Sequence, residues 1–186
     1  MPIPQPILKT PRLILRPCTL ADAPAVQRLA GDREIAATTL NIPHPYERKM
    51  AEEWIASHPQ LLEENKQVIY GITLASDGAF VGTISLSLKW DERMAELGYW
   101  IGRPYWNRGY CTEAARAIVE YGFIRLNLHR IFAHHLTRNP ASGRVMQKLG
   151  MQHEGHLRQH ILKWGVFEDV EVYGLLREEF ISRRGK

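Results

Sequence analysis

The sequence contains little cysteine and no long apolar run. Cys18 and Cys111 are its two cysteines in 186 residues, and they stand in unrelated contexts. Two such cysteines do not make the disulfide framework of a small secreted protein, so reduced thiols are the default. No apolar run reaches the length that spans a bilayer, and the first residues lack the apolar core of a signal peptide. We therefore expect a soluble cytoplasmic protein with no membrane partner.

The chain also lacks a continuous basic stripe and any visible repeat. Lys and Arg number 24 against 20 Asp and Glu, which gives a formal net charge of +4, and the basic residues are mixed with acids. Only this net charge supports nucleic-acid binding, which is not expected, although it would help an anionic ligand to approach. With 45% hydrophobic residues, the chain suits one domain over 1–186 with a sizeable core.

Hydrophobic periodicity predicts an α/β fold. Two strands joined by a helical crossover follow a meander of three antiparallel strands, so the sheet is mixed but mostly antiparallel, with helices on its faces. Pro59 is expected to interrupt the second helix. The expected elements are strands at 12–17, 67–75, 80–88, 94–102 and 130–137, helices at 19–32, 46–64 and 139–150, a glycine turn followed by a helix over 103–127, and a terminal hairpin at 156–176.

The segment "RPYWNRGYCT" (103–112) lacks the glycine patterns of common nucleotide-binding loops. It has neither the Gly-x-x-x-x-Gly-Lys-Ser/Thr of a P-loop nor three spaced glycines. Gly109 nevertheless stands directly before a helical pattern, where a ligand can approach the backbone and unpaired N–H groups attract phosphate. A plain strand-to-helix connection explains the same residues, so the segment alone leaves both interpretations open.

The order of motifs along the chain is more specific. The chain reads "KTPRLILRP" (9–17), "YWNRGYCTEA" (105–114), "NPAS" (139–142) and "FEDVEVYGLLREEF" (167–180), with Glu96 on a strand between the first two. In combination these segments resemble the GNAT superfamily of acyl-CoA-dependent N-acetyltransferases over nearly the whole chain. The resemblance is closest to the branch that acetylates ribosomal-protein N-termini. It implies a GNAT-type central sheet, acetyl-CoA as co-substrate, no metal and a primary amine as acceptor.

The resemblance also implies which residues bind coenzyme A. The turn before the helix should cradle the pyrophosphate with its backbone amides, and Cys111 is expected to pack there rather than to react. The strand 94–102 should part from its neighbour and expose the amides of Trp100 and Gly102, with Ile101 between them, to the pantetheine arm and the acyl oxygen. The implied pyrophosphate residues are Asn107, Arg108, Gly109, Tyr110, Cys111 and Thr112.

Glu96 is the candidate general base. Side chains alternate along a strand, so Glu96 and Trp100 share one face. An ammonium group cannot attack a thioester, and a carboxylate beside an apolar cleft can take its proton, directly or through water. The alternative is an exposed glutamate paired with a cation. The resemblance also points to a catalytic glutamate in a later strand, where this chain has Ile161, and this shifts the role of base to Glu96.

Asn139 and Ser142 begin the last short helix. An N-cap role alone explains Asn139, and the resemblance adds contact of both residues with the pantetheine arm. Many superfamily members protonate the leaving thiolate with a tyrosine, where this chain has Met146. The resemblance therefore gives that role to Ser142.

The remaining polar residues do not define a second site. His134 and His135 are adjacent on a strand and so face opposite sides, and zinc is not expected. The acceptor is a protein or peptide N-terminus by resemblance, or a small amine such as a polyamine, aminoglycoside or amino-acid derivative. Segment 33–66 should form much of its wall. A coenzyme A-binding module without turnover is a further alternative, and the chain is expected to be a monomer or a homodimer.

Overall fold

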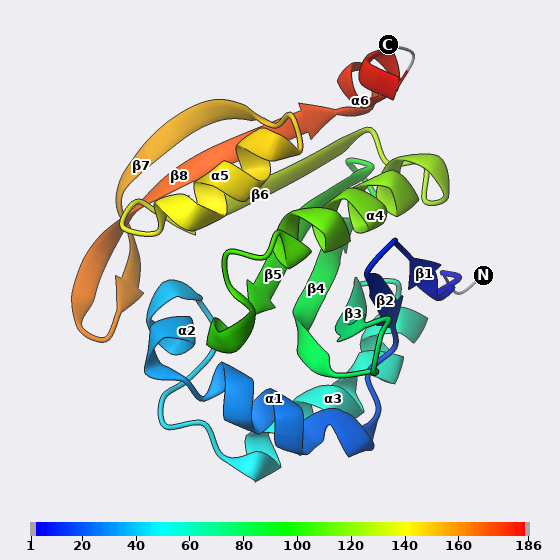
Figure 1. Cartoon of the computed structure of the whole chain (residues 1–186). Helices are drawn as coiled ribbons and strands as arrows, with labels where there is room; N and C mark the ends of the chain where they lie inside the picture. The colour runs from blue at the N-terminus through cyan, green and yellow to red at the C-terminus, as the bar shows by residue number, and fades with distance from the viewer. Residues whose placement is uncertain (1–2, 185–186) are drawn as a thin grey trace.

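The computed structural model describes residues 3–184 as one eight-stranded sheet with helices on both faces (Figure 1). The strand order is β1-β2-β3-β4-β5-β6-β8-β7. The strands are β1 (Leu8–Lys9), β2 (Leu13–Arg16), β3 (Gln67–Leu74), β4 (Phe80–Lys89), β5 (Met94–Ile101), β6 (Arg130–Leu136), β7 (Gln152–Lys163) and β8 (Val166–Leu176). The α-helices are α1 (Ala23–Ala30), α2 (Arg33–Thr38), α3 (Arg48–Glu63), α4 (Tyr110–Ile124), α5 (Pro140–Lys148) and α6 (Arg177–Arg184).

Strand pairing confirms the mixed, mostly antiparallel sheet. All neighbouring strands run antiparallel except β5 and β6. The chain crosses from β5 to β6 through α4, as a parallel pair requires. Between β3 and β4 a short turn is closed by Gly78, whose φ of 75° is readily adopted only by glycine.

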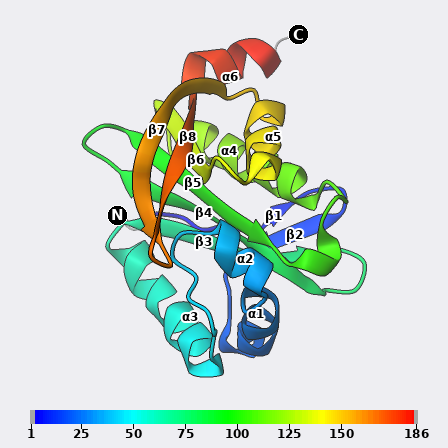
Figure 2. The same ribbon diagram turned by 90° about the vertical axis from the view of Figure 1, so that its left-hand side faces the viewer.

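Helices α4 and α5 cover one face of the sheet, and α1 and α3 cover the other (Figure 2). Tyr70, Ile84 and Leu86 project toward α4 and are fully buried against Ile118 and Phe123. A second, smaller cluster joins α1 and α3 to the opposite face. Because side chains alternate, strands β3, β4 and β5 are apolar toward α4 and carry most of their polar residues on the opposite face, toward α1 and α3.

The structure differs from the expected helices and strands at three places. Helix α3 runs through Pro59 without interruption, because the packing of Ala51 and Ile55 offsets the one hydrogen bond that proline removes. The helix expected at 19–32 is present as a short 3-10 turn over Leu20–Asp22 followed by α1, and a further helix, α2, comes after it because Asp32 accepts the amide of Glu34 at 2.9 Å and caps it. The terminal hairpin begins at Gln152 rather than at residue 156.

The centre of the sheet is parted. Strands β5 and β6 pair only between Met94–Glu96 and Arg130–Phe132. Beyond this point β5 continues to Ile101 alongside β4, and β6 continues to Leu136 alongside β8. The divergence leaves an opening between the carboxyl ends of the two strands, as the resemblance implied.

Candidate active site

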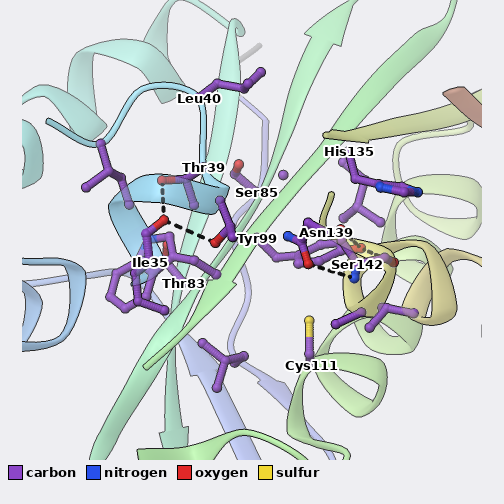
Figure 3. Close-up of a pocket in the computed structure, with 18 of the residues that line it drawn as sticks. Ile35, Thr39, Leu40, Thr83, Ser85, Tyr99, Cys111, His135, Asn139 and Ser142 are labelled. Atoms are coloured by element: carbon purple, nitrogen blue, oxygen red, sulfur yellow. Dashed lines mark hydrogen bonds between the residues drawn. The ribbon is translucent and has the colours of Figure 1, made fainter. Parts of the chain in front are cut away.

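A cavity of about 850 Å³ occupies this opening. On one side lie the beginnings of α4 and α5, which contribute Cys111, Asn139 and Ser142 (Figure 3). On the other side lie the end of α2 and the polar face of β3, β4 and β5, which contribute Thr39 and Ser85. All the β5 residues from Glu96 to Ile101 line it, so the exposed edge of β5 separates the two sides.

The first side presents the N-terminus of α4. Gly109 is the residue before the helix, and its φ of 78° gives a left-handed conformation that favours glycine. The amides of Tyr110, Cys111 and Thr112 open the helix, so they have no partner within it, and all three residues line the cavity. Such a terminus can hold a phosphate without a side chain.

A polar network fixes the turn before α4. Glu113 accepts hydrogen bonds from the Thr10 hydroxyl at 2.6 Å, from the Arg12 amide at 2.9 Å and from the Arg12 Nε at 2.7 Å. Arg12 also donates to the carbonyl oxygen of Arg108 at 2.9 Å and lies over the Tyr110 ring. The "TPR" and "TEA" motifs, about a hundred residues apart, therefore meet and hold this turn in place.

Two residues assigned to coenzyme A do not line the cavity. The carbonyl oxygen of Arg108 accepts a hydrogen bond from Arg12, and Arg108 is absent from the lining of the cavity. Gly102 faces α1, where an added Cβ would lie 2.7 Å from Leu29 Cδ2. Conversely, Arg144 and Lys148 on α5 line the cavity and form no ion pair within residues 3–184. These two cations could pair with anionic groups of a ligand, and sequence reasoning missed them because no motif marks them.

The register of β4 and β5 decides which amides face the opening. Gly102 N donates to Val81 O at 2.8 Å, so the Gly102 amide points toward β4. Antiparallel pairs alternate, and Trp100 pairs with Thr83 in the same phase, so the Trp100 amide also points toward β4. The expectation that the Trp100 and Gly102 amides face the opening is therefore wrong. The amides of Tyr99 and Ile101 point the other way, toward the gap.

Glu96 and His134 meet at the point where β5 and β6 part. Glu96 Oε1 lies 3.1 Å from His134 Nδ1, and the two side chains are 35% and 21% exposed. Both line the cavity on the face of the sheet opposite α4. His134 is two residues beyond Phe132, the parallel partner of Glu96, so alternation along β6 turns it to the same face. The sequence could not predict this contact because it depends on which strands become neighbours.

His135 faces the other side of β6, as expected. It is buried against α5, where its Nε2 lies so close to Gly143 that an added Cβ would be 2.6 Å away. Its Nδ1 contacts the carbonyl oxygen of Leu136 at 2.8 Å, and its ring stacks on Tyr173. Within residues 3–184 no three His, Cys, Asp or Glu side chains group as a metal site, and no helix there has the length and apolarity to cross a membrane.

Ser142 is held by contacts from two elements. Its amide donates to Asn139 Oδ1 at 3.4 Å, which confirms Asn139 as the N-cap of α5. Its Oγ lies 2.9 Å from the Tyr99 hydroxyl, which also donates to the Ser142 carbonyl oxygen at 3.0 Å. Burial raises the pKa of Tyr99 far above its usual range, so this hydroxyl stays protonated. Met146 is buried in the core.

Cys111 is not suited to nucleophilic chemistry. Burial raises the pKa of its thiol to about 12, and a thiol rather than a thiolate is a poor nucleophile. It packs against the main core cluster at the first turn of α4. Its small side chain leaves the backbone of this turn open to the cavity.

The second side of the cavity is polar and mostly uncharged. Gln67 Nε2 donates to Ser87 Oγ at 3.1 Å and lies 3.4 Å from Ser85 Oγ, which makes a strip across β3 and β4. The register places Ser87 directly beside Glu96. Among the described residues, Glu34 and Glu96 are the carboxylates that line the cavity.

A helix N-terminus beside parted strands is the architecture of an acyl-CoA-dependent transferase. Residues 12–152 match the family model described as Acetyltransferase (GNAT) domain. The chain belongs to the GNAT family and is an acetyl-CoA-dependent N-acetyltransferase, as its motifs indicated.

Known relatives and solved structures cover nearly the whole chain. The chain is 34% identical over 173 residues to the uncharacterized N-acetyltransferase YoaA of Bacillus subtilis (strain 168), covering 92% of this chain and 97% of YoaA. RimL, a ribosomal L7/L12 alpha-N-protein acetyltransferase solved with coenzyme A, has a TM-score of 0.86 at 17% identity, covering 94% of this chain and 99% of that one. Spermidine N-acetyltransferase from Vibrio cholerae, solved with CoA and spermine, has a TM-score of 0.80 at 23% identity, covering 92% and 99%. The last two likenesses concern the fold alone.

Proposed function

We propose that the chain transfers the acetyl group of acetyl-CoA to the amino group of a protein or peptide N-terminus. The observation that carries this proposal is the charge of the second side of the cavity. Glu96 stands there, partly buried, beside the neutral strip of Gln67, Ser85 and Ser87, whereas Glu34, the other carboxylate of the lining, is exposed. An N-terminus brings one ammonium group followed by amides, which matches one carboxylate and a row of hydrogen-bonding groups. A polyamine brings several charges, each of which needs an anionic partner when desolvated.

The first side of the cavity holds the donor in this proposal. Acetyl-CoA supplies the activated acyl group. The amides at the start of α4 bind its pyrophosphate, and Arg144 and Lys148 add positive charge beside it. The Tyr99 and Ile101 amides face the gap and stabilise negative charge that develops on the acyl oxygen.

Two groups on opposite sides of β5 move the protons. Glu96 accepts a proton from the acceptor ammonium. His134 Nδ1 lies 3.1 Å from Glu96 Oε1, so the two side chains share that proton in a hydrogen bond. Tyr99 donates its one proton to the Ser142 carbonyl oxygen, and Ser142 Oγ, 2.9 Å from the Tyr99 oxygen, carries the proton that turns toward the departing sulfur. The thiolate gains that proton, and Ser142 regains one from solvent or from Tyr99.

A substrate panel with thiol-release detection tests the acceptor. Peptides that begin with Ser, Ala or Met are compared with spermidine and an aminoglycoside, and the same peptides with blocked N-termini serve as controls. We expect turnover on a free N-terminus and none on its blocked form. A higher kcat/KM for spermidine or the aminoglycoside would assign a small-amine acceptor instead. Coenzyme A binding without thiol release on any amine would indicate a binding module.

A further inference from the structure

The wall of the second side has little regular structure of its own. Helix α2 ends at Thr38 and α3 begins at Arg48, and in the described chain no amide between residues 40 and 46 donates to a backbone carbonyl. This segment nevertheless lines the cavity opposite β4 (Figure 3). Its lining residues are Thr39, Leu40, Asn41, Ile42 and Tyr46.

Two side chains from the carboxyl-terminal half of the chain hold this wall, Lys163 from outside the cavity and Arg138 from within its lining. Lys163 Nζ, at the end of β7, lies 3.3 Å from Leu40 O and 3.4 Å from Ile42 O. Arg138, just before α5, donates from Nη2 to Ala37 O at 2.7 Å. Figure 2 shows the tip of the β7–β8 hairpin beside α2 and the loop that follows it. Two cations thus bind carbonyl groups at the end of α2 and in the loop that follows it.

Lys163 is an unusual group to bury. It is 7% exposed, and no carboxylate pairs with it within residues 3–184. Burial lowers its pKa, and the nearby charge of Arg138 lowers it further. Its polar contacts are the two carbonyl groups, and its Nζ lies 5.2 Å from the centre of the Trp164 ring. A buried charge contributes less to stability than an apolar side chain of the same size, so packing alone does not explain a lysine here.

We propose that Lys163 is a positioning residue that fixes the Leu40 and Ile42 carbonyls and so sets the shape of the acceptor wall. The tip of the β7–β8 hairpin thereby determines which amine fits, although Lys163 itself does not line the cavity. The inference rests on the proposed function only in taking this wall as the acceptor side.

Hydrogen exchange tests the structural part without any acceptor. In Lys163→Met we expect the hydrogen-bonded amides at the end of α2, where Thr39 N donates to Ile35 O at 3.0 Å, to exchange about tenfold faster, because the carbonyl groups that follow them lose their contacts with Lys163. Peptides from α4 should exchange as in the wild type. Lys163→Arg should restore protection, and Lys49→Met, which removes an 80% exposed lysine from α3, should change nothing. Unchanged exchange at the end of α2 in Lys163→Met would overturn the proposal.

Steady-state kinetics test the specificity part. With the peptide selected in the panel, Lys163→Met should raise the KM for the acceptor about tenfold, or about 1.4 kcal/mol. The KM for acetyl-CoA and kcat should stay within about twofold of wild type, because the first side of the cavity is untouched. Faster exchange with an unchanged acceptor KM would overturn the specificity role. If the panel yields no turnover, the proposed function fails while exchange still decides the positioning role.

Discussion

In the proposed mechanism, Glu96 takes the proton of the acceptor ammonium group. Glu96→Gln keeps the shape of the side chain and removes its ability to take a proton. We expect kcat at pH 7 to fall by at least about a hundredfold, with the dissociation constant of acetyl-CoA unchanged. Glu92→Gln, at an exposed position in the β4–β5 turn, is the matched control and should behave as wild type. A wild-type pH–rate profile in Glu96→Gln would mean that another group is the base.

In the proposed mechanism, Gly109 shapes the turn whose amides bind the pyrophosphate of acetyl-CoA. Gly109→Val places a β-branched side chain at a φ of 78°, where it is strained, and beside the amides that face the phosphate. We expect at least a tenfold weaker affinity for acetyl-CoA by calorimetry, about 1.4 kcal/mol. Gly78→Val has the same kind of strain at a φ of 75° with nothing within 4 Å, far from the cavity. Equal loss of affinity in both variants would attribute the effect to stability instead.

The comparison of Trp100 with Tyr99 shows what sequence can and cannot predict at this scale. Alternation correctly places Glu96 and Trp100 on one face, because side-chain direction follows from the strand alone. The direction of each amide depends on which neighbour the strand pairs with and in which phase, so the amides of Tyr99 and Ile101 could not be identified. His134 was missed for the same reason, since its partner comes from a strand more than thirty residues away.

At the scale of elements, the hydrogen bonds of Thr10 and Arg12 to Glu113, which join the N-terminal segment to α4, can be tested directly. Burial raises the pKa of Glu113, but hydrogen bonds from Thr10 and Arg12 outweigh it and leave the pKa lowered. Glu113→Ala should cost about 2 kcal/mol of unfolding free energy and weaken acetyl-CoA binding, because Arg12 no longer fixes the turn. Glu120→Ala, an exposed residue on the same helix, should do neither. Full affinity in Glu113→Ala would show that the turn needs no support.

The predicted elements agree best where periodicity and turn residues act together. The strands from 67 to 101 and the helix after Gly109 appear as expected, because their apolar spacing matches the faces they bury. The uninterrupted α3 shows the limit of a local rule. The cost of Pro59 is local, whereas the packing of Ala51 and Ile55 that offsets it comes from elements distant in sequence.

At the scale of the whole molecule, carboxylates that join distant segments predict sensitivity to acid. Hydrogen bonds from His156 and His153 lower the pKa of Glu171 to about 2, and Arg130 lowers the pKa of Glu154. Each group is more acidic in the folded chain than the usual glutamate value of about 4.3. Their contribution to stability is therefore present above that value and is lost as the pH falls through the folded pKa.

Urea unfolding between pH 7 and pH 2 measures this effect. We expect the unfolding free energy to decline below about pH 5, and the decline to be shallower in Glu171→Gln. The same contact raises the pKa of His156, so its contribution is present at low pH and is lost as the pH rises through that pKa. Glu168→Gln, on the same strand, is the control because its partner is Arg138. An identical decline in Glu171→Gln and wild type would show that Glu171 does not contribute to the loss of stability in acid.

The short pairing of β5 with β6 divides the sheet into two leaves. Strands β1 to β5 form one leaf and β6, β8 and β7 the other, and along this seam they share three residue pairs. A pantetheine arm lying along the free edge of β5 would act as a borrowed strand that fastens the leaves together. Bound acetyl-CoA would then raise the free energy of unfolding, so the protein would resist unfolding most when its acetyl donor is abundant.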